Sequence, residues 1–339
     1  MRLIDLHVDW LLQYAGETTV YDPACYARVP QRLEQVRGYL QDTSAAVLSC
    51  YRHADDWARC QSDPWAALGE LITRIEAEFP GRLLQGPDDL ARWRDDAKGL
   101  CWGVIGIEGF DALVRSPVDL ERFPPLFERG VRLFQPVYTA ANALGGSAAN
   151  GDDRGLTDLG RSFLQALFDL SRDGGRPLFD LAHLNPFSAA DALAWFEADA
   201  ERPRRVLPVY SHGTLAHDGF LKPRAITREN LRRLRALGGV IGLSVGPPFF
   251  SIAEQLKSAI EDAAALPFAG HAGFQGIAIG TDFLGVDQTL PGLGNVEEVM
   301  QWVAATFDET TAAALVYENA QRLLDRAVGK GPHQPPEAA

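Results

Sequence analysis

Short apolar segments recur along the chain and alternate with longer segments whose apolar residues repeat at helical spacing. Each short segment is bounded by glycine, proline or charged residues and is rich in Val, Ile and Leu. This composition is typical of strands that are buried on both faces of a parallel sheet. We therefore predict eight strands, at residues 3–8, 45–50, 100–107, 130–137, 177–182, 206–210, 239–245 and 276–280.

The segments between these runs predict helices. Residues 64–79 repeat apolar side chains every three or four positions, which indicates an amphipathic helix. Thr157 is a candidate N-cap of a helix that stops at residues 174–175. Ser188, with Asp191 three residues later, is a candidate capping box. Further helices are expected at residues 227–237, 296–306 and 309–326.

Eight strands that alternate with helices predict an α/β fold, specifically a (β/α)8 TIM barrel. The alternative is a doubly wound open sheet, but no GxGxxG motif follows a predicted strand, which disfavours its dinucleotide-binding form. Residues 11–42 are too long for an ordinary βα connection, so we expect extra helical structure over the barrel mouth. We expect one domain over residues 1–328 and a disordered tail over residues 329–339.

Composition and charge narrow the class of protein further. The 339 residues are 46% hydrophobic and 23% charged, and the net charge of −13 would repel nucleic acid. No apolar run approaches the ~20 residues of a membrane helix, and the first residues lack the pattern of a signal peptide. The four cysteines show no CxxC spacing and are too few for a disulfide framework. We therefore expect a soluble, reduced, cytoplasmic protein.

Residue types that bind metals stand at the ends of several predicted strands. Six of them mark five of the eight strands: His7, Asp9, Glu108, His183, His212 and Asp282. Because the carboxyl ends of barrel strands meet at one rim, where active sites form, we expect these side chains to converge. His7 and Asp9 are two residues apart, so they are expected on the same side of a strand.

Imidazoles combined with carboxylates suit zinc or a similar divalent ion. Five or more ligands exceed one tetrahedral site, and a carboxylate such as Glu108 could bridge two ions that hold a hydroxide between them. The ordinary alternatives are a hydrogen-bonded structural histidine at any one strand end and, for Asp282, the cap of a following helix. We expect His53 and His217 to be exposed loop histidines.

The chain resembles the renal (membrane) dipeptidase family of the amidohydrolase superfamily from residue 5 to about residue 324. The resemblance rests on ordered motifs: Asp-Leu-His-Val-Asp at 5–9, Gly-Ile-Glu-Gly at 106–109, Gly-Val-Arg at 130–132, Gly-Leu-Thr-Asp-Leu-Gly-Arg at 155–161, Asp-Leu-Ala-His at 180–183, Ser-His at 211–212, Gly-Thr-Asp-Phe-Leu-Gly at 280–285 and Asn-Ala-Gln-Arg at 319–322. It implies a (β/α)8 barrel with two zinc ions, or another divalent metal, and leaves a homodimer open.

The resemblance also implies roles for the rim residues. It assigns two ligand sets that share a bridging carboxylate: His7, Asp9 and Glu108 for one zinc, and Glu108, His183 and His212 for the other. Asp282 would carry a proton from the bridging hydroxide to the leaving amine and face the substrate's amino group. Arg224 would bind the substrate carboxylate. The alternative for Arg224 is a solvated charge beside Arg228.

Two positions depart from the family pattern. Tyr138 stands where the family carries a histidine that contacts the developing oxyanion, and a tyrosine hydroxyl could donate the same hydrogen bond. The alternative is a tyrosine that only packs at the strand end. Gly246 stands near a tyrosine of many relatives, so we expect open space there. The metal site thus matches the family better than the substrate-binding residues do.

Three functions remain open at this point. The first is a zinc-dependent dipeptidase that hydrolyses the amide bond of a dipeptide or dipeptide-like substrate by a metal-bridging hydroxide. The second is a binuclear metal amidohydrolase that acts on another amide, such as an N-acyl amino acid or a cyclic amide. The third is a non-enzymatic barrel, which is disfavoured because all six rim residues are present.

Overall fold

The computed structural model describes residues 2–18, 20–26, 30–59, 63–96, 98–138, 142–148, 152–170, 175–217, 224–269 and 273–329. Eight strands form one sheet in the order β1-β2-β3-β4-β5-β6-β7-β8, and every neighbouring pair is parallel. The strands are β1 (Leu3–Val8), β2 (Thr43–Tyr51), β3 (Trp102–Glu108), β4 (Val131–Gln135), β5 (Leu178–Asp180), β6 (Leu207–Tyr210), β7 (Val240–Leu243) and β8 (Ile277–Ile279).

The sheet closes on itself between its first and last strands. Val8 forms a parallel bridge with Phe283, which follows β8. The Asp9 amide donates to the Phe283 carbonyl at 3.0 Å, and the Asp282 amide donates to the His7 carbonyl at 3.1 Å. Each observed strand overlaps one predicted run, and the predicted (β/α)8 barrel is confirmed.

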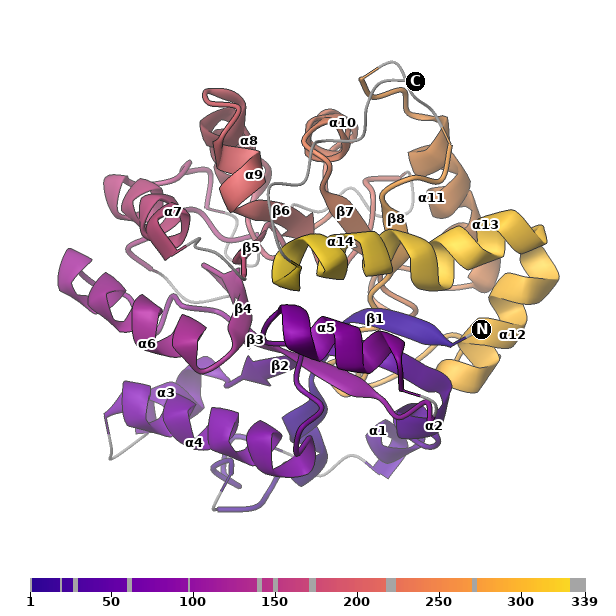
Figure 1. Ribbon diagram of the computed structural model, residues 1–339, viewed down its shortest axis with the longest axis horizontal. Helices are drawn as coiled ribbons and strands as arrows, with labels where there is room; N and C mark the ends of the chain where they lie inside the picture. Colours follow the sequence, from indigo (N-terminus) through magenta and orange to yellow (C-terminus); the bar gives the residue numbers. More distant parts are fainter. Residues whose placement is uncertain are drawn as a thin grey trace.

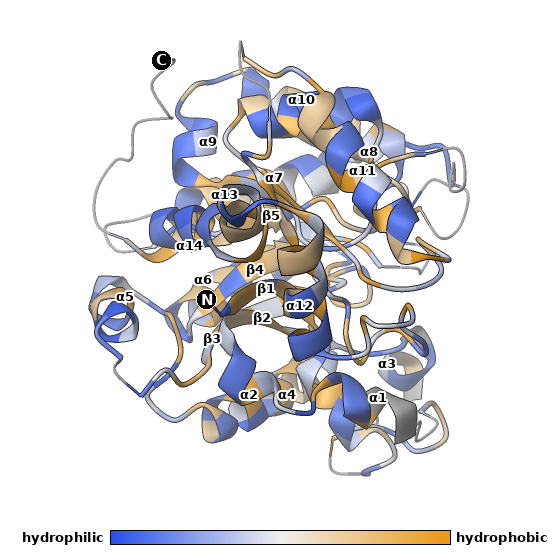
Figure 2. Cartoon of the chain, turned by 90° about the vertical axis from the view of Figure 1, so that its right-hand side faces the viewer, coloured by the Kyte–Doolittle hydropathy of each residue, from blue (hydrophilic) through white to orange (hydrophobic). Residues whose placement is uncertain are grey.

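Helices surround the strands (Figure 1). They are α1 (Pro30–Gln35), α2 (Tyr39–Asp42), α3 (Ala54–Arg59), α4 (Pro64–Glu78), α5 (Pro87–Arg94), α6 (Phe123–Glu128), α7 (Asp158–Leu170), α8 (Pro186–Glu197), α9 (Arg202–Arg205), α10 (Arg228–Ala236), α11 (Ala253–Ala265), α12 (Val296–Thr306), α13 (Glu309–Ala313) and α14 (Asn319–Val328), with the 3-10 helices η1 (Trp10–Tyr14) and η2 (Pro117–Arg122) and the π-helix η3 (Ala314–Glu318). Figure 2 shows apolar strands inside and polar residues on outer helices such as α5.

The last helix covers the amino-terminal end of the barrel. Leu323 and Leu324 of α14 belong to the same buried cluster as Ile4 of β1 and Val104 of β3. Figure 1 shows α14 lying across the strands. Because apolar side chains fill this end of the barrel, polar residues gather at the opposite rim, where the strands end.

Most predicted helices are confirmed, with one cap corrected. Thr157 caps α7, since its hydroxyl accepts from the Gly160 amide at 3.1 Å. The capping box at Ser188 is wrong. Asn185 caps α8 and accepts from the Ser188 amide at 2.7 Å, because the helix begins at the proline after it. Asp191 instead accepts from the Leu156 amide at 3.0 Å.

Several further predictions concern the chain ends and the mouth. The expected helical structure within residues 11–42 is confirmed by η1, α1 and α2. The helix expected at 309–326 is divided into α13, η3 and α14. Of the predicted tail, residues 330–339 lie outside the described residues. Among the helices that the structure describes, none is both long and apolar enough to cross a bilayer.

Candidate metal-binding active site

The structure brings the six predicted residues to the carboxyl-terminal rim of the barrel. Their positions are His7 in β1, Asp9 just after β1, Glu108 at the end of β3, His183 after β5, His212 after β6 and Asp282 after β8. Five of the six are buried, and Asp282 is partly buried. Residues that are far apart in sequence therefore lie at one rim, because parallel strands place their ends together.

An irregularity in β1 contributes to the placement of His7. The register of β1 against β2 shifts between Asp5 and Val8, and such a bulge re-aims the side chains beside it. The buried Asp5 carboxylate accepts from the Thr281 amide and from the Tyr39 hydroxyl, both at 2.8 Å. Asp5 thus fixes the segment that carries His7, a role that the sequence alone did not reveal.

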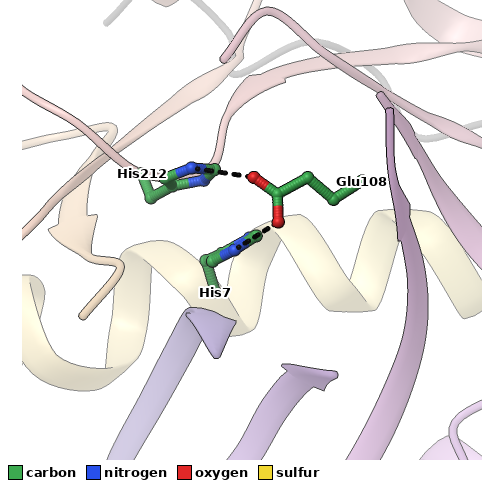
Figure 3. Close-up of side chains that lie close together, drawn as sticks. All are labelled: His7, Glu108 and His212. Atoms are coloured by element: carbon green, nitrogen blue, oxygen red, sulfur yellow. Dashed lines mark ion pairs between the residues drawn. The ribbon is translucent and has the colours of Figure 1, made fainter. Parts of the chain in front are cut away.

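The Glu108 carboxylate stands between histidines from three strands. Its Oε2 lies 3.4 Å from His7 Nε2, while its Oε1 lies 3.1 Å from His183 Nε2 and 3.4 Å from His212 Nε2. Figure 3 shows this carboxylate beside the rings of His7 and His212, with one oxygen turned toward each ring. The Ser49 hydroxyl donates to Oε2 at 3.2 Å and holds the group in place. Each oxygen of Glu108 therefore faces a different imidazole set.

Two further carboxylates complete the rim. Asp9 Oδ1 lies 3.7 Å from His7 Nε2. Ligand atoms of His7, Asp9 and Asp282 lie within 4.8 Å of one another, as do those of His7, Glu108 and His212. The Asp282 side chain thus stands within reach of the same donors, although the family resemblance gives it a different role.

Crowded buried carboxylates shift the pKa values at this rim. Burial, together with the charge of Glu108, raises the pKa of Asp9 to about 8, although the neighbouring His7 acts to lower it. Burial also raises the pKa of Asp282 to about 7, with Glu108 adding to the rise while His7 and Arg224 oppose it. Carboxylates held this close favour a cation between them. A pKa near 7 also suits a group that takes up and releases a proton at neutral pH.

The imidazoles respond to burial and to these charges. Burial, with the charge of Arg224, lowers the pKa of His183 to about 4, and burial with the neighbouring His7 lowers that of His212 well below its ordinary value. Both rings are therefore neutral, the form that binds metal ions. Burial alone would lower the pKa of His7, but Glu108 and Asp9 raise it well above its ordinary value.

The chemistry of the donor set fits divalent metal ions. Both ring nitrogens of His7 are buried and neither makes a hydrogen bond among the described residues; the same holds for Nδ1 of His183 and Oδ1 of Asp9. Buried polar atoms without partners are rare and point to a group that completes them. Imidazole nitrogens and carboxylate oxygens are the ligands that zinc prefers.

A second layer of hydrogen bonds orients the histidines. The Ser211 hydroxyl lies 2.8 Å from Nδ1 of His212 and donates to the buried Asp180 carboxylate. Asp180 also accepts from the amides of Ser211 at 2.9 Å and Ala182 at 3.0 Å. Such contacts fix the ring of a metal-binding histidine. Asp180 was not singled out from the sequence, although it opens the Asp-Leu-Ala-His motif.

Backbone geometry also marks the rim. His183 and Asp282 have positive φ values of 65° and 63°, which non-glycine residues rarely adopt and which cluster at functional sites. In the described chain the next helix after Asp282 is α12, which Asn295 caps. The alternative role of Asp282 as a helix cap is therefore wrong.

A cavity of about 840 Å³ opens above the rim. Its lining combines four of the rim residues with loop residues that follow several strands: Asp9, Leu12, Cys25, Tyr26, Tyr51, His53, Glu108, Tyr138, His183, Arg224, Pro247, Pro248, Phe249, Asp282, Gly285, Val286, Asp287 and Gln288. Leu12, Cys25 and Tyr26 come from the long segment after β1, so that segment covers the mouth as predicted. The volume is suited to a small molecule.

Tyr138 lies beside His183 at the rim and also packs against the edge of the hydrophobic core. Its ring centroid is 4.3 Å from that of His183 and 4.8 Å from that of Tyr51, at the end of β2. Burial raises the pKa of Tyr138 well above its ordinary value, so its hydroxyl remains a donor. Tyr51 was not identified from the sequence.

Arg224 also lines the cavity and is separate from the basic residues near it in sequence. Arg228 pairs with Asp262 at 2.6 Å and Arg232 pairs with Glu229 at 2.9 Å, both on the surface. The alternative placement of Arg224 on that solvated face is therefore wrong.

The space predicted at Gly246 is filled, because a Cβ there would lie 2.8 Å from the Gln288 carbonyl oxygen. His217 is half-buried rather than exposed; it contacts the Phe249 carbonyl at 3.2 Å and stacks on Phe250. His53 is exposed as expected, yet it lines the cavity.

A barrel whose rim carries buried histidines and carboxylates is typical of a metal-dependent hydrolase. The family model of the membrane dipeptidases, peptidase family M19, matches residues 1–331, so the chain belongs to that family. It is a metallo-dipeptidase, and the family predicted from the sequence motifs is confirmed.

Known relatives are distant. The chain is 28% identical over 274 residues to an uncharacterised protein in the pqqA 5′ region of Klebsiella pneumoniae, covering 76% of this chain and 93% of that one. It is 26% identical over 231 residues to an uncharacterised dipeptidase of Schizosaccharomyces pombe, covering 66% of this chain and 51% of that one.

A similar fold occurs in a metallopeptidase from Rhodobacter sphaeroides, solved with a phosphinate mimic of the dipeptide L-Ala-D-Ala. The TM-score is 0.69 at 19% identity, and the match covers 96% of this chain and 99% of the other. At that identity the similarity concerns the fold.

Proposed function

We propose that the chain is a two-zinc dipeptidase that hydrolyses the amide bond of a dipeptide or dipeptide-like substrate. The observation that carries this proposal is the Glu108 carboxylate, whose two oxygens face His7 on one side and His183 and His212 on the other. We assign His7, Asp9 and Glu108 to one ion and Glu108, His183 and His212 to the other. Zinc is favoured by the mixed nitrogen and oxygen donors.

Two divalent ions bound by these residues would polarise the scissile carbonyl and provide a hydroxide nucleophile at neutral pH. The remaining chemistry falls to side chains of the rim. We assign to Asp282 the transfer of a proton from the attacking water to the leaving amine nitrogen. Its carboxylate lies beside Asp9 and His7, and its raised pKa of about 7 suits both halves of that transfer.

Tyr138→Phe is expected to lower kcat about 10²–10³-fold and to change KM much less, because the hydroxyl would donate to the oxyanion that forms only in the transition state. Steady-state kinetics on a dipeptide measure this difference. Tyr138→His restores the family residue and should improve hydrolysis of ordinary dipeptides relative to the native substrate class. Wild-type kinetics in both variants would show that Tyr138 only packs beside His183.

Arg224→Lys is expected to raise KM for a free-acid substrate about tenfold or more, and to affect the C-terminal amide of the same substrate far less. The planar guanidinium pairs with a carboxylate through two parallel hydrogen bonds, which an ammonium cannot reproduce. Comparing KM for the acid and the amide measures this effect. Equal changes for both substrates would remove Arg224 from carboxylate recognition.

The substrate class is tested by a hydrolysis panel. We favour a dipeptide because the chain belongs to a dipeptidase family, and a relative of similar fold was solved with a dipeptide mimic. A panel of dipeptides, N-acyl amino acids and cyclic amides, assayed with zinc present, should show the highest kcat/KM for dipeptides. The feature that favours N-acyl amino acids or cyclic amides is Tyr138, which stands in place of the family histidine. A higher kcat/KM for those substrates would replace the dipeptidase proposal with an amidohydrolase that acts on them.

Three further proposals come from the sequence. We propose that residues 1–328 form one domain and residues 329–339 a dispensable tail. We also propose a homodimer, by analogy with the family. A cytoplasmic location is favoured because Cys50 and Cys101 form no disulfide within the part of the chain that the structure describes.

A further inference from the structure

The Tyr210 hydroxyl contacts both the guanidinium and the main-chain carbonyl of Arg224. Tyr210 is the last residue of β6 and is only 2% exposed. Its hydroxyl accepts a hydrogen bond from Nη1 of Arg224 at 3.0 Å and donates one to the main-chain carbonyl of Arg224. Because the strand is rigid, this double contact fixes both the backbone and the head group of the arginine.

A third contact directs the guanidinium toward the cavity. Nη1 of Arg224 also donates to the His212 carbonyl at 3.2 Å, and the guanidinium carbon lies 5.3 Å from the Phe249 ring centre. Both hydrogen bonds use Nη1. A guanidinium carries five donors in a planar fork, so the edge formed by Nη2 and Nε keeps the spacing that a carboxylate requires.

Gly213 leaves room for these contacts. A Cβ at this position would lie 2.5 Å from the Tyr210 hydroxyl oxygen and 2.9 Å from Nη1 of Arg224. The residue also has a φ of 137°, which side chains other than glycine rarely adopt. Both the backbone conformation and the absence of a side chain are therefore needed for Tyr210 to reach Arg224.

We propose that Tyr210 is a positioning residue that holds Arg224 ready for a free substrate carboxylate. This inference rests on the proposed function. A mobile arginine loses conformational freedom when it binds its ligand, whereas a fixed one has lost it already, so fixation strengthens binding without a new contact to the substrate. Tyrosine and phenylalanine differ only by this hydroxyl, so the substitution Tyr210→Phe isolates the effect of the hydroxyl on Arg224.

The test is Tyr210→Phe in the zinc-loaded enzyme. We measure kcat and KM for a dipeptide and for its C-terminal amide. The ratio of the acid to the amide kcat/KM is expected to fall about tenfold, mainly through KM of the acid, because the variant loses a hydrogen bond to a charged group. In the double variant Tyr210→Phe with Arg224→Lys, the change in this ratio, expressed as a free energy, should be smaller than the sum of the changes in the two single variants. Both substitutions act on the same contact, so their effects are not additive.

Tyr39→Phe is the matched control. It also removes a buried tyrosine hydroxyl, which donates to Asp5 at 2.8 Å, so it shows how much stability is lost with such a hydrogen bond away from Arg224. Thermal unfolding of both variants measures this loss of stability. The acid-to-amide ratio should change only in Tyr210→Phe, and an equal change in both variants would contradict the positioning role.

The remaining outcomes separate the two proposals. Failure of the wild-type enzyme to hydrolyse any dipeptide would contradict the proposed function. An active wild type with an unchanged ratio in Tyr210→Phe would contradict only the inference. If Tyr210→Phe does not fold, Gly213→Ala displaces the same contact, and an unchanged ratio there would contradict the inference equally.

Discussion

Asp282→Asn is expected to lower kcat by about 10²–10⁴-fold or more while the protein keeps its metal ions. Asparagine has the shape of aspartate, but it cannot accept a proton from the attacking water or return one to the leaving amine. The raised pKa of about 7 places Asp282 where a proton carrier at neutral pH is most effective. Steady-state kinetics and elemental analysis on the same sample measure both quantities.

The control is Asp262→Asn, which makes the same substitution on the outer surface of α11, where Asp262 pairs with Arg228. It should keep both activity and metal. Loss of metal from Asp282→Asn would make Asp282 a ligand, which its position beside His7 and Asp9 allows geometrically. In that case the proton would have to be carried by another group.

His212→Ala is expected to remove at least one ion per chain and to lower kcat about 10³-fold or more, since a metal ion contributes several kcal/mol to stabilising the transition state. The ring is buried, and its Nε2 faces Glu108 Oε1 at 3.4 Å. Elemental analysis after metal saturation and gel filtration measures the ion count. Alanine also leaves the Ser211 hydroxyl without its ring partner.

His217→Ala is the matched control for metal content. His217 is half-buried in the loop after β6, yet it contacts Phe249 rather than the rim. Its variant should retain the wild-type ion count. Equal metal content in His212→Ala and the wild type would remove His212 from the ligand set and leave Glu108 without part of its proposed bridging role.

The barrel could be predicted from the sequence because its signals are local. Buried parallel strands are continuous apolar runs, so each of the eight appears as a short segment with clear ends. The convergence of His7, Glu108 and Asp282 then follows from topology alone, since every strand of such a barrel ends at the same rim. A residue at the carboxyl end of one strand thus lies near the residues at the same end of the other strands, even where these are far apart in sequence.

Contacts that depend on packing could not be predicted in this way. The shift in β1 between Asp5 and Val8 arises from pairing with β2, so the sequence of β1 alone does not reveal it. The filled space at Gly246 results from the approach of Gln288, over 40 positions away. The role of the Tyr210 hydroxyl has no sequence signal either, because its contact with Arg224, 14 positions away, forms only in the folded chain.

Metal titration coupled to dipeptide hydrolysis tests the central claim most directly. The purified protein is stripped with a chelator, reconstituted with measured equivalents of zinc, and assayed at each step for hydrolysis of a dipeptide. The arrangement of His7, His183 and His212 around Glu108 predicts that the stripped protein is inactive and that activity rises until two ions per chain are bound. Full activity at one ion per chain, or activity that persists without metal, would contradict the account.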